Sequence, residues 1–293
     1  MDKAVIKLPL GDYRAPTQQE LNDGKAYVRR RNETALALTA LVEKILLDLL
    51  EDIFRLCYND NTKGEDFKID LNEAIFEKIS ELMDEAADDI LEYIKEYATK
   101  CTTNESRIYM LILYILSLGR NKMRFEKTLQ TYMKRYLYDI EAMIAAYKYA
   151  GYNMPTALVK AKNAYRNVYQ QPEVKAAYKV PTMKAMYIRS KGIHYDFQTG
   201  IATVGLSSNG STNVIYLAET TLKMAWNRSE ALDFKEKGAV GYYQLRGSNY
   251  PCQMCDAEVG FHLSVDGIIN DPMIHPHCAC YRIPIYSANN VKL

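Results

Sequence analysis

The chain has 293 residues, of which 48% are hydrophobic and 25% charged, which is an ordinary globular composition with room for two domains. Its formal net charge of +1 gives no overall reason to expect a nucleic acid or a membrane surface as a partner. Tyr is unusually frequent, at 24 residues, and tyrosine-rich surfaces suit interfaces because the ring buries area while the hydroxyl keeps a hydrogen-bond partner.

No segment has the pattern of a signal peptide or a membrane span. Residues 1–16 lack the long apolar core of a secretory leader. The most apolar run, from Ile108 to Leu118, would rise about 16 Å as a helix, whereas a bilayer needs roughly 20 residues. We therefore expect no membrane contact and synthesis in the cytoplasm.

The N-terminal part predicts an extended arm followed by a long helix. Proline and glycine oppose helix formation within residues 1–16, which we expect to be extended. Thr17 and Glu20 then have the spacing of a capping box, which begins a helix that runs to about Tyr58. The residues expected on its apolar face are Leu36, Leu38, Leu41, Ile45, Leu46, Leu49, Leu50 and Ile53.

Further helices are expected up to the middle of the chain. One covers about residues 70–100, where acids outnumber lysines, and its charged face is expected to be solvated. The next begins near Asn104, and a third covers about residues 124–150 before Gly151, a residue that ends many helices. Pro155 suits the first turn of another helix.

From residue 120 onward basic residues outnumber nearby acids, and tyrosines are interleaved with them. Such a surface can hold a phosphate backbone and stack bases. The more ordinary interpretation is that the tyrosines pack between helices while the basic side chains lie in water, since no compact nucleic-acid-binding motif is present. The candidate contacts to nucleic acid or to a protein partner are Arg120, Lys122, Arg124, Lys127, Lys134, Arg135, Lys160, Lys162 and Arg166.

Two prolines break this pattern shortly after residue 170, where we place a domain boundary. A helix capped by Ser211 or Thr212 is expected to end at Gly238. Strands are expected at residues 239–245, 259–264 and 281–286. The sequence thus predicts a mainly α protein that consists of an extended arm (1–16), a helical domain (17–170) and a small α+β domain (171–293).

Cysteine and histidine are concentrated near the C-terminus, in the pattern Cys252-x-x-Cys255 followed by His275-Pro-His277-Cys278-x-Cys280. Thiolates are soft ligands, and Zn²⁺ takes four of them, or three with one imidazole, in a tetrahedron. Two close thiol pairs at the ends of a loop can therefore close on one metal ion. The candidate ligands of a structural Zn²⁺ are Cys252, Cys255, Cys278, Cys280, His277 and His275.

The spacing leaves two other interpretations open. The same cysteines can form disulfides, which the cytoplasm opposes but which a protein that leaves the cell inside a particle can acquire later. They can also stay reduced and buried without a ligand. A Cys-x-Cys pair is tighter than the usual Cys-x-x-Cys knuckle, so the motif itself does not decide.

Catalytic interpretations of this region meet specific obstacles. A zinc deaminase also carries Pro-Cys-x-x-Cys but needs an upstream His-x-Glu, whereas the second residue after His194 is Asp196. A cysteine nucleophile needs a single activated thiol, and paired cysteines favour crosslinking instead. Two alternatives stay open: a metal-dependent nuclease or hydrolase that uses His275, His277 and Asp271 as an open site, and a DNA-binding module.

The cysteine and histidine spacing resembles the phage Mu F-like minor head protein family, also called phage head morphogenesis proteins. The family pairs an early Cys-x-x-Cys with a late His-Pro-x-Cys-x-Cys before a terminal strand, which matches Cys252 to Cys255 and His275 to Cys280. The resemblance covers about residues 205–287.

Upstream, the resemblance includes three residues that it implies to be structural, namely Glu219, Asn227 and Gly238. The chain also departs from the family. Leu217 and Ala279 stand where the family usually has arginine, so any role of those arginines does not carry over.

The resemblance implies a minor capsid protein of a tailed phage or prophage that docks at the portal or the capsid interior and aids assembly, DNA packaging or ejection. The implied partners are portal and capsid proteins, with phage DNA as a further candidate. The implied location is the head interior or portal vertex of the virion, after synthesis in the bacterial cytoplasm. Neither catalysis nor a small-molecule substrate is expected.

Overall fold

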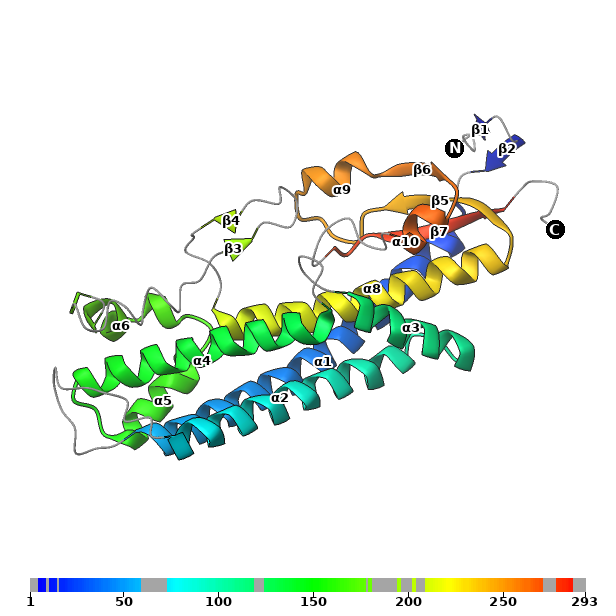
Figure 1. Cartoon of the computed structure of the whole chain (residues 1–293). Coiled ribbons are helices and arrows are strands. Elements are labelled where there is room, and N and C mark those ends of the chain that lie inside the picture. Colours follow the sequence, from blue (N-terminus) through cyan, green and yellow to red (C-terminus); the bar gives the residue numbers. More distant parts are fainter. Residues whose placement is uncertain are drawn as a thin grey trace. The chain divides into compact units, whose positions relative to one another are not determined.

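The structure, a computed structural model, describes residues 5–8, 11–14, 16–58, 73–118, 124–177, 179–180, 194–195, 202–203, 209–270 and 278–286. Most of these residues lie in helices, and a small antiparallel sheet lies near the C-terminus (Figure 1). The expected fold class is therefore confirmed: the protein is mainly α, with a small α+β part that carries a cysteine cluster.

The described elements follow one another along the chain. The longer helices are α1 (Gln18–Cys57), α2 (Glu73–Thr99), α3 (Glu105–Ser117), α4 (Phe125–Tyr149), α5 (Met154–Ala164) and α8 (Gly210–Glu236). The short ones are the 3₁₀ helix η1 (Val168–Gln170), α6 (Pro172–Ala177), α9 (Gln253–Ala257) and α10 (Asp266–Asn270). The strands are β1 (Val5–Leu8), β2 (Gly11–Arg14), β3 (His194–Tyr195), β4 (Ala202–Thr203), β5 (Ala239–Leu245), β6 (Gly260–Leu263) and β7 (Tyr281–Tyr286). None of the described helices combines the length and the apolar character that a membrane crossing requires.

Local chemistry sets several helix ends where the sequence predicts them. The backbone N–H of Glu20 donates to Thr17 Oγ1 at 3.2 Å while the N–H of Thr17 donates to Glu20 Oε2 at 2.7 Å, so the capping box of α1 is confirmed. Gly151 and Gly238 follow α4 and α8 with φ of 77° and 78°, a conformation that glycine adopts without strain. These two glycines end their helices.

The chain divides into two compact units, each made of segments that are far apart in sequence. Unit 1 comprises the described parts of Met1–Leu38, Ile94–Ile115 and Glu219–Leu293, and unit 2 those of Thr39–Tyr93 and Leu116–Ala218. The boundaries fall inside α1, α2, α3 and α8 rather than in linkers, and residue 170 lies within unit 2.

Tyrosines form part of the interior of unit 2. Tyr136 of α4 is fully buried, and its hydroxyl donates to the backbone oxygen of Leu46 in α1 at 2.8 Å. The hydroxyl of Tyr169 donates to the buried carboxyl of Asp139. A buried hydroxyl must keep a partner, and these two find theirs inside the unit.

The apolar face of α1 differs at one position from the prediction. Leu36 is 67% exposed, whereas Leu38 is fully buried, so the assignment of Leu36 to the apolar face was wrong. Two residues correspond to a rotation of about 200° around a helix, which turns Leu36 away from the buried stripe.

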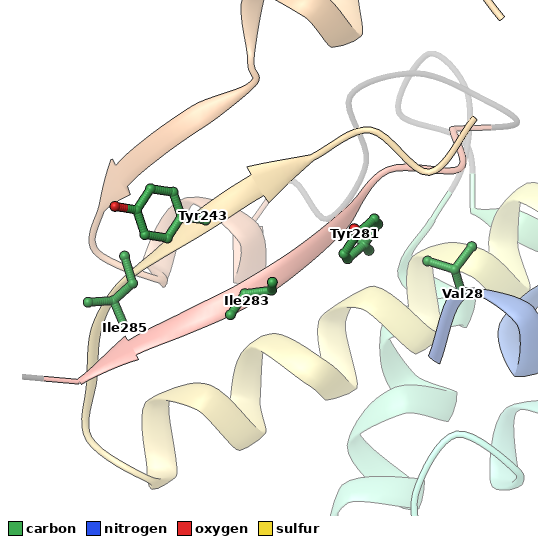
Figure 2. Packing of buried hydrophobic residues seen from close by; sticks show 5 residues of the cluster. All are labelled: Val28, Tyr243, Tyr281, Ile283 and Ile285. Carbon is green, nitrogen blue, oxygen red and sulfur yellow. The ribbon is translucent and has the colours of Figure 1, made fainter. Parts of the chain in front are cut away.

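The sheet of unit 1 has the strand order β6-β5-β7, and both pairings are antiparallel. Tyr243 of β5 pairs with Phe261 of β6 and Ile283 of β7. Figure 2 shows the apolar cluster on this side of the sheet, where Val28 of α1 joins the strand residues. The cluster consists of Val28, Tyr243, Tyr281, Ile283 and Ile285.

Because side chains alternate along a strand, the neighbouring Tyr242 belongs to a second cluster. There it packs with Ala231 and Phe234 of α8 and with Val265 and Ile268 around α10. The strand β5 is therefore held between α1 on one face and α8 with α10 on the other, which positions the loops that carry the cysteines.

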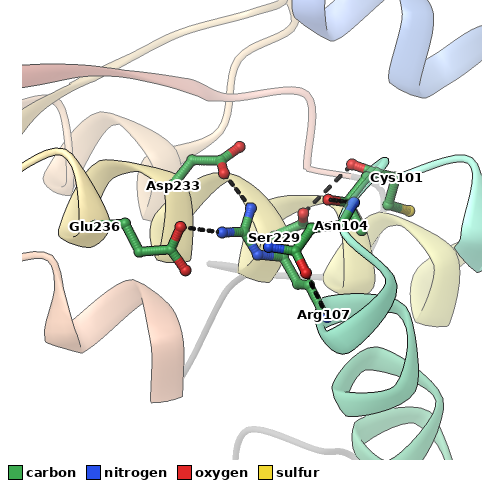
Figure 3. Close-up of polar contacts among 7 residues, drawn as sticks. Cys101, Asn104, Arg107, Ser229, Asp233 and Glu236 are labelled. Atoms are coloured by element: carbon green, nitrogen blue, oxygen red, sulfur yellow. Dashed lines mark hydrogen bonds and ion pairs between the residues drawn. The ribbon is translucent and has the colours of Figure 1, made fainter.

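A buried arginine joins the start of α3 to α8 within unit 1 (Figure 3). Arg107, whose side chain is 5% exposed, donates to the carboxylates of Asp233 and of Glu236, the latter at 2.5 Å. Ser229 Oγ donates to the backbone oxygen of Cys101 at 3.3 Å. These contacts fix the segment that precedes α3 against α8.

Candidate metal centre

Three cysteines from two separate segments converge in unit 1. Cys255 lies on α9, and Cys278 and Cys280 lie just before β7. Their three Sγ atoms all lie within 4.8 Å of one another, and the residues are only 3–4% exposed. The predicted convergence of the early and late cysteines is thereby confirmed for these three residues.

The sulfur spacing fits a metal better than a disulfide. Four sulfurs at about 2.3 Å from a zinc ion in a tetrahedron lie about 3.8 Å apart. The Sγ atoms of Cys255 and Cys278 are separated by 3.8 Å, whereas a disulfide bond requires about 2.05 Å. All six cysteines of the chain are free thiols in the structure. The cluster is thus a buried group that could hold a metal ion.

Two of the three buried sulfurs, those of Cys255 and Cys280, are in surroundings that disfavour a bare thiolate. Burial raises the pKa of Cys255 to about 12. The pKa of Cys280 is also raised, first by its hydrogen bond with the thiol of Cys278 and then by burial. A bound cation would reverse this preference, because metal coordination deprotonates a thiol.

Cys252 lies beside the cluster in a different environment. It is half-buried and packs against the three buried cysteines, but its sulfur is not one of the three that lie within 4.8 Å of one another. Its pKa is lowered, chiefly because the backbone N–H of Cys255 donates to it. His275 and His277, the other candidate ligands, and Asp271 of the nuclease alternative lie outside the described residues.

A single helical turn brings the first cysteine pair together. Cys252 is the N-cap of α9, with extended backbone at φ −150°, and its backbone oxygen accepts from the N–H of Asp256 at 2.9 Å. Arg246 closes the preceding loop because its guanidinium donates to the Asp256 carboxylate and to the backbone oxygen of Tyr250. The loop from 246 to 252 is thus tied to α9.

A glycine allows this loop to meet the second cysteine pair. A Cβ built on Gly247 would lie 1.8 Å from the backbone oxygen of Ala279, the residue between Cys278 and Cys280. No side chain can occupy that space without moving the backbone of one segment. The two cysteine-bearing segments therefore touch through their main chains.

Two residues of the helices support the cluster. Met224 of α8 packs against the cysteines. Arg31 of α1 is fully buried and donates to the backbone oxygens of both Cys278 and Cys280. Sequence reasoning missed Arg31. Its spacing could have indicated that it is buried, because Ala35 and Leu38 follow it at helical spacing in the buried stripe of α1.

A cavity of about 340 Å³ borders the cluster on one side. It is lined by Arg246, Ser248, Tyr250, Pro251, Cys252, Cys255, Ala279 and Cys280. The cysteine group is therefore buried but adjoins a space formed by its own loops.

The three residues that match the family pattern upstream have structural contacts. Glu219 forms an ion pair with the buried Lys223 one turn later, at 2.5 Å. Asn227 is 2% exposed and its Oδ1 accepts from Arg31 Nη1 at 2.5 Å. Gly238 ends α8.

The basic candidates fall into two groups within unit 2. Lys127 and Lys134 of α4 and Arg124 at its N-cap are exposed, and Arg135 of α4 is half-buried. Three others form ion pairs inside the unit: Lys160 with Glu173, Lys162 with Glu51 and Arg166 with Glu43. Arg120 and Lys122 lie outside the described residues.

Comparison of the chain with protein-family models, with curated proteins and with solved structures gives no match.

Proposed function

We propose that the cysteine cluster binds one Zn²⁺ ion as a structural staple of unit 1. The observation that carries the proposal is the convergence of three buried Sγ atoms, all within 4.8 Å of one another, from two segments of the chain. A set of thiolate donors selects a soft or borderline metal, for which zinc is the usual occupant. Cys252, His275 or His277 would supply the fourth ligand.

The location of the cluster gives such a staple a physical purpose. The sheet of unit 1 has three strands of four to seven residues, which is the smallest number of strands that supports a sheet in water. The cysteine-bearing segments flank β6 and α10 in the sequence. A metal that joins them would close this part of the chain into a loop and contribute its binding energy to folding.

Burial favours a structural role over a catalytic one. A catalytic zinc keeps a coordination position open to water or substrate, whereas structural sites are closed by protein ligands. The residues of the cluster are 3–4% exposed, which suits a closed site.

We further propose that the chain is a minor capsid protein of a tailed phage or prophage that docks at the portal or the capsid interior. What supports this is the spacing of Cys252, Cys255, His275, Cys278 and Cys280, which resembles the phage Mu F-like minor head proteins. A unit stapled by a metal would suit a protein whose task is to bind other proteins during assembly.

Elemental analysis tests the metal site. The full chain, expressed without added metal and kept reduced, is expected to contain about one zinc per chain. Thiol titration with a chromogenic reagent should find fewer reactive thiols in the native protein than after unfolding with a chelator. The matched control is Cys57→Ser, a cysteine of unit 2 that should leave the zinc content unchanged. Metal-free protein with every thiol reactive would exclude the proposal.

Particle composition tests the assembly role. The protein should be found by mass spectrometry in purified particles of the phage or prophage that encodes it, at a few copies per portal. It should also co-purify with the portal protein of the same genome when the two are co-expressed. Purified particles that lack the protein, together with no portal binding, would contradict the role in the head.

One observation favours DNA contact as a second activity. Lys127 and Lys134 are exposed and, seven residues apart, lie on one face of α4, and the exposed Arg124 precedes them at the N-cap of that helix. This three-residue stripe could contact successive phosphates, whereas Lys160, Lys162 and Arg166 are held by acids of their own unit.

A further inference from the structure

Arg31 is the only one of three consecutive arginines in α1 that is buried. Arg29 and Arg30 are exposed, whereas Arg31 is 0% exposed and stands among the largest fully buried side chains of the described chain. Removing a guanidinium from water costs several kcal/mol unless its charge and donors find partners. The partners of Arg31 therefore indicate what it does.

The polar partners of Arg31 are the segment between the late cysteines and one residue of α8. Nη1 donates to Asn227 Oδ1 at 2.5 Å and to the backbone oxygen of Cys280 at 3.3 Å. Nη2 donates to the backbone oxygen of Cys278 at 3.4 Å. The planar fork of the guanidinium thus spans the Cys278–Cys280 segment, so it fixes the main chain that carries two of the three clustered thiols.

The charge of Arg31 is only partly offset by its surroundings, because the one carboxyl that interacts with it electrostatically among the described residues is that of the buried Glu230, whose pKa burial raises to about 7. Among the described residues none forms an ion pair with it, its hydrogen-bond acceptors are neutral oxygens, and Nε is buried without an acceptor. The Tyr27 ring lies 5.8 Å from the guanidinium carbon. A Zn²⁺ ion bound by three or four thiolates is a net anion, and a buried cation next to the backbone of its ligands would offset that charge.

We propose that Arg31 is a positioning residue of the metal centre, which aligns the Cys278–Cys280 segment for coordination and balances the charge of the metal–thiolate group. The inference rests on the zinc site proposed above. It also connects the N-terminal part of α1 to metal binding, because the residue that orients the late cysteines lies 247 and 249 residues away from them in the sequence.

The test compares substitutions at Arg31 with the same substitutions at the exposed Arg30. Zinc affinity of the full chain is measured by competition with a chromophoric chelator, and cobalt is used as a spectroscopic probe of the thiolate geometry. Arg31→Gln is expected to weaken zinc binding at least about tenfold, the usual effect of losing a group that orients metal ligands. Arg31→Lys keeps the positive charge but not the planar guanidinium, and it should reduce zinc affinity less than Arg31→Gln does. Arg30→Gln should bind zinc as the wild type does.

Asn227→Asp provides a second variant that keeps the fold. The substitution preserves the size and the acceptor atom that Arg31 uses, but it gives the guanidinium a carboxylate and so neutralises its charge. Zinc affinity should fall severalfold, and the thiolate-to-cobalt absorption band should shift, while the far-UV circular dichroism of the metal-free protein stays unchanged. Asn227→Asp therefore tests the charge of Arg31 even where Arg31→Gln does not fold.

The outcomes separate this inference from the metal site itself. Zinc binding with equal affinity and equal cobalt spectra in wild type, Arg31→Lys and Asn227→Asp would overturn the role of Arg31 and leave the metal site standing. A reduced wild-type chain that binds neither zinc nor cobalt would overturn both.

Discussion

Gly247 lies so close to Ala279 that a Cβ at position 247 would be 1.8 Å from the backbone oxygen of Ala279. This main-chain contact joins the loop before Cys252 to the segment between Cys278 and Cys280. We expect Gly247→Ala to force the two segments apart, to reduce zinc content and to destabilise unit 1 by about 1–3 kcal/mol. The measurement is zinc per chain together with the urea midpoint.

Gly267→Ala is the matched control for that substitution. Gly267 lies in α10, and a Cβ there would meet nothing within 4 Å. Alanine should be neutral or slightly stabilising at that position, because it is the better helix former. Equal effects of the two substitutions would show that the contact with Ala279 is unimportant.

Substitution of the clustered cysteines should separate the metal ligands from the other thiols. Cys255→Ser, Cys278→Ser and Cys280→Ser each remove one of the three sulfurs within 4.8 Å and should abolish stoichiometric zinc. Because metal binding contributes to folding, these variants and chelator-treated wild type should unfold at clearly lower urea concentration than the holo-protein.

Cys252→Ser tests which residue is the fourth ligand of the metal. If Cys252 coordinates, its loss should weaken zinc binding as strongly as the loss of Cys255. If His275 or His277 coordinates instead, Cys252→Ser should keep the zinc and the corresponding His→Ala variant should lose it. Full zinc content in all of these variants and in the three buried-cysteine variants would contradict the cluster as the binding site.

The two ion pairs of Arg107 should stabilise the folded protein more than an exposed ion pair does. Its side chain is 5% exposed and donates to both Asp233 and Glu236. Arg107→Met should lower the free energy of unfolding by about 1–3 kcal/mol, because two charge-assisted hydrogen bonds at a buried side chain are lost. Lys78→Met is the control, since Lys78 and Glu81 are both more than half exposed and such a pair contributes at most about 1 kcal/mol. Similar losses in both variants would mean that the burial of Arg107 adds nothing.

Asp139 should make unit 2 less stable as the pH rises from about 4 to 7. Burial raises its pKa from the ordinary value of 3.8 to about 7, although the Tyr169 hydroxyl, the Gly210 N–H and Arg135 act in the opposite direction. Between these two pH values the folded protein holds a proton that the unfolded chain has released. The stabilisation is therefore complete below pH 4 and is lost by about pH 7, with a total of at most ~4 kcal/mol.

Asp139→Asn isolates that contribution. The amide can donate to the Tyr169 oxygen and accept from the Gly210 N–H, so the contacts are retained without a titrating group. The difference between the urea midpoints of wild type and variant should change across pH 4–7 and be constant above it. A difference that does not vary with pH would show that Asp139 titrates with an ordinary pKa. Glu230, which burial also brings to a pKa of about 7, is common to both proteins and cancels.

DNA binding, if carried by the three-residue stripe of α4, should depend steeply on salt. Replacing Arg124, Lys127 and Lys134 with Gln should reduce the slope of log affinity against log salt by roughly 2–3, one contribution per lost phosphate contact. The measurement is fluorescence polarisation of a labelled duplex at several salt concentrations. A variant with Gln at Lys25, Lys44 and Lys237, which are also exposed, changes the net charge equally and should keep the slope. Identical slopes for both variants would rule the stripe out.

The parts of the fold that local chemistry determines could be predicted from the sequence. Three examples are the capping box at Thr17 and Glu20, the glycine that ends α4 and the strand over Tyr281–Tyr286. Each depends on residues that lie close together in the sequence. The convergence of Cys255 with Cys278 and Cys280 was also predictable, because paired thiols at such density have few other uses.

The rest depends on contacts between distant residues. The position of Arg31 in the buried stripe of α1 is visible in the sequence, but its hydrogen-bond partners lie 196, 247 and 249 residues away, and no local pattern encodes them. The acids that hold Lys160, Lys162 and Arg166 likewise come from other elements, so the sequence alone presents those side chains as available. The requirement for glycine at 247 arises only once Ala279 lies against it.

The discontinuous make-up of unit 1 has a consequence for its biosynthesis. Residues 16–38 leave the ribosome before their partners in the sheet and in the cysteine cluster, which lie at 239–245 and 278–286. Contacts across such separations are slow to form and leave apolar surface uncovered meanwhile. Val28 and Arg31 of α1 therefore lack their final neighbours until β7 has been translated.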